Sequence, residues 1–343
     1  MRYGIVLDEV FLDHLVPPGH PERPERIQVL LDTLAPLRKR PDVTWLAPKA
    51  ADESAILAVH SEEHLRRIKA TAGQGPQALD PDTHTGANSY KTALLVAGSA
   101  LELVKSLGAG ELDSGFVMGR PPGHHAERDR AMGFCLINNA AVAAQASISL
   151  GLAERVAVVD FDVHHGNGTQ NIFYERSDVL YVSSHQHPFY PGTGLQAELG
   201  TGEGRGFTAN LPLRAGSGDS FYSRVYADLV SPILLEYDPD LIIVSAGFDA
   251  HEDDPLGGMD LSVEGFVSLT QTLNDVARKT AEGRILYILE GGYSLDGLSQ
   301  SVLSSIQTCL NGREADISMS QETESEEYIN RARATFSRYW KSL

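Results

Sequence analysis

The segment from Val156 to Gly168, with the sequence VAVVDFDVHHGNG, constrains the fold of this chain more than any other. Its first half is an apolar run rich in β-branched residues, which predicts a strand buried on both faces. Asp160, Asp162 and His164 follow at alternate positions, so we expect them on one side of the carboxyl end of the strand. The glycines that follow turn the chain toward a helix. In open α/β sheets, sites are built in the crevice beyond such strand ends.

Two interpretations of this acidic segment remain open. The three side chains could bind a divalent metal ion, or they could form a salt-bridged Asp/His cluster that caps the next helix. Buried charge is costly unless it is paired or bound to metal. The metal site is therefore the interpretation that we favour.

Composition limits the class of protein. The chain has 343 residues, 42% hydrophobic residues and a net charge of −18. This charge argues against direct binding of nucleic acid and favours cationic substrates such as lysine-rich peptides or polyamines. Two isolated cysteines indicate a reducing compartment. With no apolar leader and no long apolar run, we expect a cytoplasmic protein that does not contact the membrane.

Strand and helix patterns alternate along the chain without a repeat or a linker. The expected strands are 1–6, 116–118, 156–160, 179–183, 207–213, 241–245 and 285–289. The expected helices are 24–35, two short ones within 52–72, then 93–107, 132–150, 219–237, 263–281 and 295–310, with 77–88 as a loop. This alternation predicts an α/β fold with one mainly parallel sheet covered on both faces. We expect a single domain over residues 1–343, with an acidic segment and a terminal helix from about residue 313.

Three further expected strands lead into polar side chains. The 116–118 strand precedes His124 and His125, the 241–245 strand precedes Asp249, and the 285–289 strand precedes Tyr293. Each has a simpler explanation: a satisfied core histidine pair, a helix cap and a packed aromatic ring. Carboxyl ends of parallel strands meet at one edge, so a shared site explains all of them together.

The chemistry that suits these groups is metal-assisted hydrolysis. Asp162, His164 and Asp249 would supply three ligands and leave one position open, as in catalytic zinc sites. Iron, cobalt or manganese also suit a ligand set with two carboxylates. A bound ion would acidify water and polarise a carbonyl group.

The adjacent histidines are expected to act as general base and general acid. Their rings would need partners that fix the tautomer, and Asp160 and Asn167 are the best candidates. Tyr293, on a turn with two glycines, could stabilise a developing oxyanion. Phe134 and Tyr190, each in a loop flanked by glycine, could wall a narrow slot for the methylene stem of an acylated amine.

Two other patterns are given simpler interpretations. His60 and His64 are four residues apart and could form a zinc pair, but their charged surroundings (HSEEHLRRIK) favour a solvated helix face. The glycines at 200, 202, 204 and 206 open no helix, so a mobile surface loop is preferred over a phosphate loop.

A set of motifs resembles the histone deacetylase and acetylpolyamine amidohydrolase family. The motifs are PPGHHA, GFCLINNAAVAA, VAVVDFDVHHGNGTQ, YPGTG, SAGFDAH, DPLGG and LEGGY, in the order of that family and over about residues 1–310. The resemblance implies an arginase-like α/β fold with a central eight-stranded parallel sheet. It also implies a zinc-dependent amidohydrolase that releases acetate from an acetylated lysine peptide or protein, or from another acetylated amine.

The resemblance also implies roles for individual residues. His125 would be the base of the tandem pair, and Arg26 would belong to an internal acetate-release cavity. The implied substrate-binding residues are Gly133, Phe134, Tyr190, Leu256 and Gly292. A structural K⁺ would lie near the metal, bound by the backbone carbonyl groups of Asp160, Asp162 and His164 together with Ser183 and Ser184.

The chain departs from the family pattern at three positions. Asn167 stands where class I members have Asp, which resembles class II and bacterial members. Tyr190 replaces a phenylalanine that many members use, and this affects acyl preference. Leu256 stands where some polyamine-specific members have an acidic residue, so lysine substrates are favoured over polyamines.

Two other functions were weighed. An arginase-like ureohydrolase with two manganese ions would need acidic ligands that His-His-Gly-Asn does not provide. A non-catalytic acyl-lysine binder would be marked by loss of Tyr293 or of a ligand, and all of these groups are present. The sequence is also compatible with a homo-oligomer.

Overall fold

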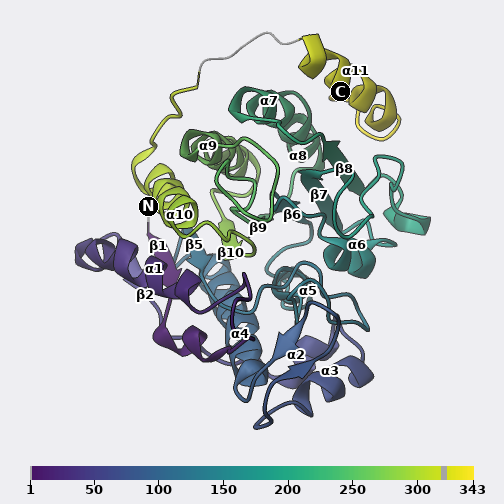
Figure 1. The fold of residues 1–343 in the computed structure, drawn as a ribbon. Coiled ribbons are helices and arrows are strands. Elements are labelled where there is room, and N and C mark those ends of the chain that lie inside the picture. Colours follow the sequence, from purple (N-terminus) through teal and green to yellow (C-terminus); the bar gives the residue numbers. More distant parts are fainter. Residues whose placement is uncertain (1, 318–322) are drawn as a thin grey trace.

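A parallel sheet of eight strands forms the centre of the computed structural model, which describes residues 2–317 and 323–343. Its strand order is β2-β1-β5-β10-β9-β6-β7-β8, and each neighbouring pair is parallel (Figure 1). The strands are β1 (Tyr3–Val6), β2 (Val43–Trp45), β5 (Ser114–Val117), β6 (Val156–Asp160), β7 (Val179–Gln186), β8 (Thr208–Leu213), β9 (Leu241–Ala246) and β10 (Ile285–Leu289). The predicted parallel sheet is therefore confirmed.

The chain order of the strands differs from their order in the sheet. Strands β9 and β10 lie between β5 and β6, although they come later in the sequence. The four strands that lead into the predicted site residues, β5, β10, β9 and β6, are thus consecutive neighbours. Their carboxyl ends meet at one edge of the sheet, where sites are built in α/β proteins.

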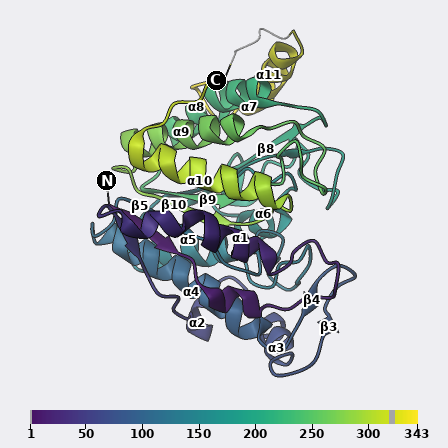
Figure 2. The ribbon, with the colours of Figure 1, turned by 60° about the vertical axis from the view of Figure 1, so that its left-hand side comes forward.

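Helices cover both faces of the sheet, as Figures 1 and 2 show from two directions. One layer contains α1 (Glu25–Leu34), α9 (Val263–Thr280) and α10 (Leu295–Asn311), with α7 (Asp219–Val225) and α8 (Ser231–Tyr237) beside α9. The other layer contains α4 (Ser89–Gly108), α5 (Asn139–Ser149) and α6 (Asn167–Phe173). Most strand residues are fully buried because each face of the sheet packs against helices.

Smaller elements complete the fold. They are α2 (Glu53–Leu57), α3 (Glu62–Lys69), the short antiparallel pair β3 (Gln77–Ala78) and β4 (His84–Thr85), and 3₁₀ turns at Glu9–Asp13, Ala35–Lys39 and Gly202–Gly204. Within residues 2–317 and 323–343, no helix has both the length and the apolar character needed to cross a membrane.

Two predicted helices differ from the structure. The helix expected from Met132 begins at Asn139, because the Asn138 side chain accepts a hydrogen bond from the Ala141 amide and caps the helix there. The preceding apolar residues form turns instead. The helix expected over 219–237 is continuous but contains a π-helical turn at Tyr226–Val230 between α7 and α8.

The interpretation of His60 and His64 as part of a solvated helix face is wrong. Both rings are buried and stack 4.7 Å apart, and His60 precedes α3. Nε2 of His60 accepts a hydrogen bond from the Asn138 amide, and Nε2 of His64 is bonded to the Leu136 carbonyl oxygen. The two histidines thus satisfy backbone groups of the segment that precedes α5, which explains their burial.

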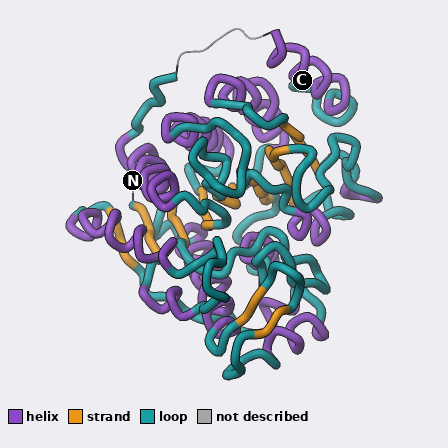
Figure 3. Tube along the Cα trace, viewed as in Figure 1, coloured by secondary structure: helices purple, strands orange, loops and turns teal. Residues whose placement is uncertain are grey.

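The predicted terminal helix is α11 (Thr323–Phe336), and it packs on the outside near α7 (Figure 3). Trp340 follows α11 in the sequence, and its ring is buried against Phe207 and Tyr237. The predicted acidic segment includes residues 318–322, which lie outside the described residues.

Candidate active site

The three predicted metal ligands meet at the carboxyl ends of β6 and β9. Ligand atoms of Asp162, His164 and Asp249 all lie within 4.8 Å of one another. Nδ1 of His164 is 3.1 Å from Oδ1 of Asp162 and 3.2 Å from Oδ2 of Asp249. Both carboxyl groups are fully buried. This geometry is that of a group that could hold a divalent metal ion.

The charges of this group fit a cation. Burial, together with the charge of Asp162, raises the pKa of Asp249 to about 7. Two carboxylates this close repel each other unless a positive charge lies between them. Backbone amides hold their other oxygens, because Gly291 donates to Oδ2 of Asp162 and Val163 donates to Oδ1 of Asp249. The donor atoms are thus oriented by the fold itself.

Two glycines allow the carboxylates to approach the backbone. A Cβ atom on Gly247 would lie 2.0 Å from Oδ2 of Asp162, and one on Gly291 would lie 2.0 Å from Oδ2 of Asp249. No side chain could occupy either position without displacing a carboxylate. The glycines of the SAGFD and LEGGY motifs are therefore required by the site.

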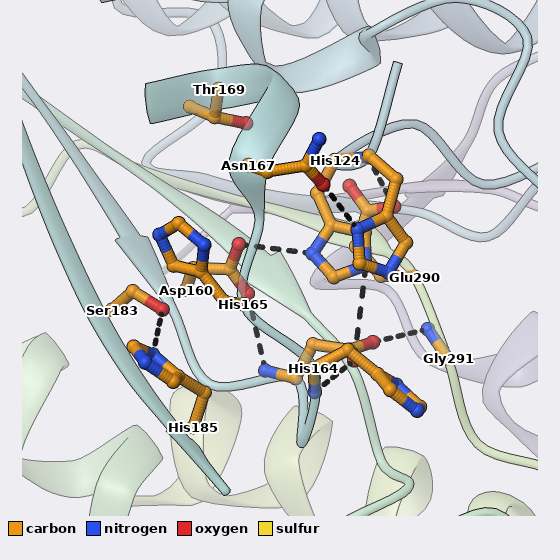
Figure 4. Close-up of polar contacts among 12 residues, drawn as sticks. His124, Asp160, His164, His165, Asn167, Thr169, Ser183, His185, Glu290 and Gly291 are labelled. Atoms are coloured by element: carbon orange, nitrogen blue, oxygen red, sulfur yellow. Dashed lines mark hydrogen bonds and ion pairs between the residues drawn. The ribbon is translucent and has the colours of Figure 1, made fainter. Parts of the chain in front are cut away.

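The sequence pattern suggested that the extended strand β6 continues through the acidic segment. The structure shows that it does not. The strand ends at Asp160, and the chain then curls because Asp160 accepts the amide hydrogen of Asp162 and Asp162 accepts that of His164. Such local bonds are typical of Asp in turns. The curl separates the roles of the two carboxylates. Asp160 faces His124 (Figure 4). Asp162 contacts His164.

His124 is paired with a carboxylate. Its Nδ1 lies 3.1 Å from Oδ2 of Asp160, which also accepts a hydrogen bond from the Tyr181 hydroxyl. Burial alone would lower the pKa of His124, but the charges of Asp162 and Asp160 outweigh it and raise the pKa to about 10. These carboxylates therefore favour the charged form of the ring.

His125 is paired with a neutral amide instead. Its Nδ1 lies 2.8 Å from Oδ1 of Asn167, and Nδ2 of Asn167 donates to Oε1 of Glu127 at 2.7 Å. Because Glu127 accepts only, it fixes the amide so that its oxygen faces His125. Nδ1 of His125 then carries the proton, and Nε2 is free to act as a base. Burial and the neighbouring His124 hold the pKa of His125 well below its ordinary value.

Tyr293 stands on a turn that is fixed by its backbone. The amides of Tyr293 and Ser294 donate to Oδ2 of Asp254 at 2.6 and 3.0 Å. The Tyr293 ring packs edge-on against Phe134, with 5.9 Å between centroids. The ring borders the cavity described next, so the phenol can reach a substrate there.

A cavity of about 470 Å³ opens above the metal-ligand group. Its lining includes Asp82, His125, Gly133, Phe134, His164, Gln186, Phe189, Tyr190, Leu256 and Tyr293. The predicted wall residues Gly133, Phe134, Tyr190 and Leu256 are thus brought together. Phe189, which the sequence did not single out, stacks on the His164 ring at 5.3 Å. Tyr190 is 36% exposed, which places it at the mouth.

Gly292 was predicted to contact substrate, but it does not line this cavity. Its carbonyl oxygen accepts a hydrogen bond from Nε of Arg26, whose Nη2 donates to the carbonyl oxygen of Glu290. Arg26 is fully buried and lies 4.9 Å from the centroid of the Tyr293 ring. Arg26 and Gly292 therefore hold the tyrosine turn, and the acetate cavity stays a prediction.

The expected cation site lies beside the acidic segment. Ser183 on β7 pairs with Asp160 on β6, and both serines at 183 and 184 are buried. Their hydroxyl groups contact Nδ1 of His185 and the Tyr226 hydroxyl, respectively. The potassium ion stays a prediction.

Comparison with known proteins identifies the family. The model of the histone deacetylase domain matches residues 20–309, which is most of the chain. The chain belongs to the histone deacetylase family. Membership shows that this histone deacetylase homologue is a hydrolase that acts on acetylated amides, and the family generally uses a metal ion.

Named relatives agree with this family. The chain is 39% identical to a probable deacetylase of Archaeoglobus fulgidus, over 87% of this chain and 83% of the relative. It is 43% identical to a histone deacetylase-like amidohydrolase of Pseudomonas aeruginosa, over 80% and 73% of the two chains. The crystal structure of the HDA15 HD domain superposes with a TM-score of 0.93 at 36% identity, covering 100% of this chain and 98% of that one. The arginase-like fold is thereby confirmed.

Several site residues of this histone deacetylase homologue were not found from the sequence. They are carboxylates that accept hydrogen bonds from the backbone or from a side-chain amide of a distant segment: Glu127, Asp254 and Glu290. Contacts between distant segments cannot be recognised from the spacing of residues in the sequence. Asp254 and Glu290 do lie inside the motifs DPLGG and LEGGY, so these motifs could have indicated both residues.

Proposed function

We propose that this protein is a zinc-dependent deacetylase that removes acetyl groups from acetylated lysine side chains, with acetylated polyamines as the alternative substrate. One observation carries the proposal. Two buried carboxylates and a partly exposed histidine that could hold a metal ion lie beside one cavity, together with two histidines that have different partners and a tyrosine. Each part of an amide hydrolysis has a residue placed to perform it.

Asp162, His164 and Asp249 would hold the zinc ion. A set of three protein ligands leaves one position open, as catalytic zinc sites do, and its two carboxylates also suit Fe²⁺ or Co²⁺. When bound, such an ion supplies Lewis acidity, which polarises the amide carbonyl and lowers the pKa of water.

The tandem histidines divide the proton transfers between them. His125 is neutral with Nε2 free, so it can take a proton from the attacking water. The neighbouring carboxylates favour the charged form of His124, which can give a proton to the leaving amine. The partners of the two rings cause this difference. The carboxylate of Asp160 stabilises a charged His124 ring, whereas the neutral amide of Asn167 stabilises a charged His125 ring less.

Tyr293 would stabilise the charge that develops on the amide oxygen. Its ring borders the cavity, and its turn is anchored by Asp254 and Arg26. A donor fixed in this way needs little reorganisation when the oxygen becomes negative.

The shape of the cavity supports an acylated lysine as the substrate. Phe134, Phe189 and Tyr190 supply aromatic walls, which suit a methylene stem. Leu256 offers no carboxylate to a second ammonium group of a polyamine. The net charge of −18 favours a cationic substrate of either kind.

A structural potassium ion is part of the proposal. The backbone carbonyl groups of Asp160, Asp162 and His164, with Ser183 and Ser184, would bind it. Support comes from the pairing of Ser183 with Asp160 across neighbouring buried strands, which brings these segments together.

A substrate panel tests the proposed function. Metal-free protein is reconstituted with Zn²⁺, Fe²⁺ or Co²⁺ and assayed with acetyl-lysine peptides and acetylated polyamines, with Asp249→Ala as the control for contaminating activity. We expect acetyl-lysine peptides to be hydrolysed at least as well as polyamines. A strong preference for polyamines would reverse the substrate ranking, and hydrolysis of neither by any metal form would contradict the proposal.

A further inference from the structure

We propose that His124, Cys135 and Glu290 form a second metal site, through which excess zinc inhibits the enzyme. The three side chains come from separate segments: the turn after β5, the turn before α5 and the end of β10. Ligand atoms of all three lie within 4.8 Å of one another, and all three residues are buried. They share no member with the group of Asp162, His164 and Asp249.

Glu290 has a carboxylate oxygen to spare. Its Oε2 accepts hydrogen bonds from the amides of Gly123 and His124, at 2.6 and 3.1 Å. Its Oε1 is buried and has no hydrogen-bond partner among the described residues. Buried polar atoms are usually hydrogen-bonded, and a bound cation can take the place of a hydrogen-bond donor beside a carboxylate oxygen. Oε1 of Glu290 is therefore available to bind a cation.

His124 and Cys135 complete a ligand set that suits zinc. Asp160 engages Nδ1 of His124, which leaves Nε2 for a metal in the carboxylate–histidine–metal arrangement common in zinc sites. Sγ of Cys135 makes a contact of 3.3 Å with the Gly133 carbonyl oxygen, which is a weak bond for a thiol. A set of nitrogen, sulfur and oxygen donors matches zinc, which deprotonates a coordinating thiol.

Occupancy of this site would stop catalysis. Nε2 of His124 is 3.8 Å from Oδ1 of Asp162, so the second site adjoins the first. A metal bound to His124 would remove the residue that gives a proton to the leaving amine. This inhibitory consequence rests on the proposed function, whereas metal binding itself does not.

Titration of the metal-free protein with Co²⁺ tests the site, because thiolate ligation gives a charge-transfer absorption in the near ultraviolet. The first equivalent should bind at Asp162, His164 and Asp249 without this band, since that set has no sulfur. A second equivalent should produce the band. Cys135→Ala should bind one equivalent and lose the band. Cys309→Ala is the matched control, since Cys309 is the other cysteine of the chain, is buried and contacts Asn274. The Cys309→Ala variant should bind two equivalents and keep the band.

A second variant keeps the test independent of the cysteine. Glu290→Gln preserves the shape of the side chain and should abolish binding of the second equivalent while circular dichroism shows an intact fold. The inference is overturned if wild type binds one equivalent without the band, or if Cys135→Ala keeps the band. An inactive protein that still binds two equivalents with the band would contradict the proposed function and support the site. An active protein without the band would contradict the site alone.

Discussion

The phenol of Tyr293 depends on a turn that two distant residues hold. Asp254 accepts the amide hydrogens of Tyr293 and Ser294, while Arg26 donates to the carbonyl oxygens on either side of Gly291. The Tyr293 ring contacts Phe134 edge-on. The backbone is thus fixed, and the hydroxyl group remains available to the cavity.

Tyr293→Phe tests the oxyanion role. The substitution keeps the ring and its packing, so the melting temperature should barely change. Loss of one oxyanion donor should lower kcat by about 10²–10³, or ~3–4 kcal/mol, with little effect on substrate binding. Steady-state kinetics beside a melting curve measure both. Wild-type turnover in the variant would assign the ring to packing alone.

Individual site residues were predictable where the chemistry of one side chain was informative. The pairing of the tandem histidines with Asp160 and Asn167 follows from the need of a catalytic imidazole for a partner. Glu127 could not be found in this way, since its role is to orient Asn167 and depends on a contact between segments 40 residues apart.

At the scale of elements, the loop HPERPER contributes a buried ionic network beneath the site. Glu22 accepts hydrogen bonds from Arg26 at the start of α1 and from Arg120 in the turn before the tandem histidines. All three side chains are fully buried. The network ties α1 to the turn after β5, and through Arg26 to the Tyr293 turn.

Glu22→Gln tests this network. Removing the charge leaves two buried guanidinium groups with reduced compensation, which typically costs about 3–5 kcal/mol of the free energy of unfolding. Denaturant unfolding at neutral pH measures the loss. The matched control is Glu25→Gln, because Glu25 is exposed at the start of α1 and loss of its charge should have little effect. Equal stability of the two variants would contradict the network.

The same residue predicts a pH dependence. Burial alone would raise the pKa of Glu22, but the charge of Arg120 and the contact with His14 hold it well below 4.5. A lowered pKa in the folded state means that the contribution is present above about pH 4.5 and is lost as pH falls toward the folded pKa. The stability difference between wild type and Glu22→Gln should therefore shrink below pH 4.5. A difference that grows on acidification would contradict this.

Hydrophobic patterns predicted most elements but not all of their limits. Strand β2 was missed, because Val43–Trp45 is three residues long and lies at the edge of the sheet, where pairing with β1 rather than its own pattern defines it. The predicted start of α5 was wrong because residues 132–138 are mostly apolar, as in a buried helix, whereas Asn138 caps the helix and α5 begins at Asn139.

At the scale of the whole molecule, the sequence predicted which strands carry site residues but not their order in space. Placement of β9 and β10 between β5 and β6 depends on packing of both faces and has no linear signal. The order matters because it brings Asp249 next to Asp162 and Glu290 next to His124. Strand–helix alternation predicted the parallel α/β sheet, whereas the family motifs supplied the expectation of an arginase-like fold with eight strands.

Metal reconstitution tests the central claim most directly. Metal-free wild type and Asp249→Ala are titrated with Zn²⁺ while hydrolysis of an acetyl-lysine peptide and bound zinc are measured together. We predict that wild-type activity rises to a maximum at one equivalent of bound zinc. Asp249→Ala should neither bind that equivalent nor gain activity, although circular dichroism shows the same fold. Full activity in wild-type protein that elemental analysis shows to be free of metal would contradict the account.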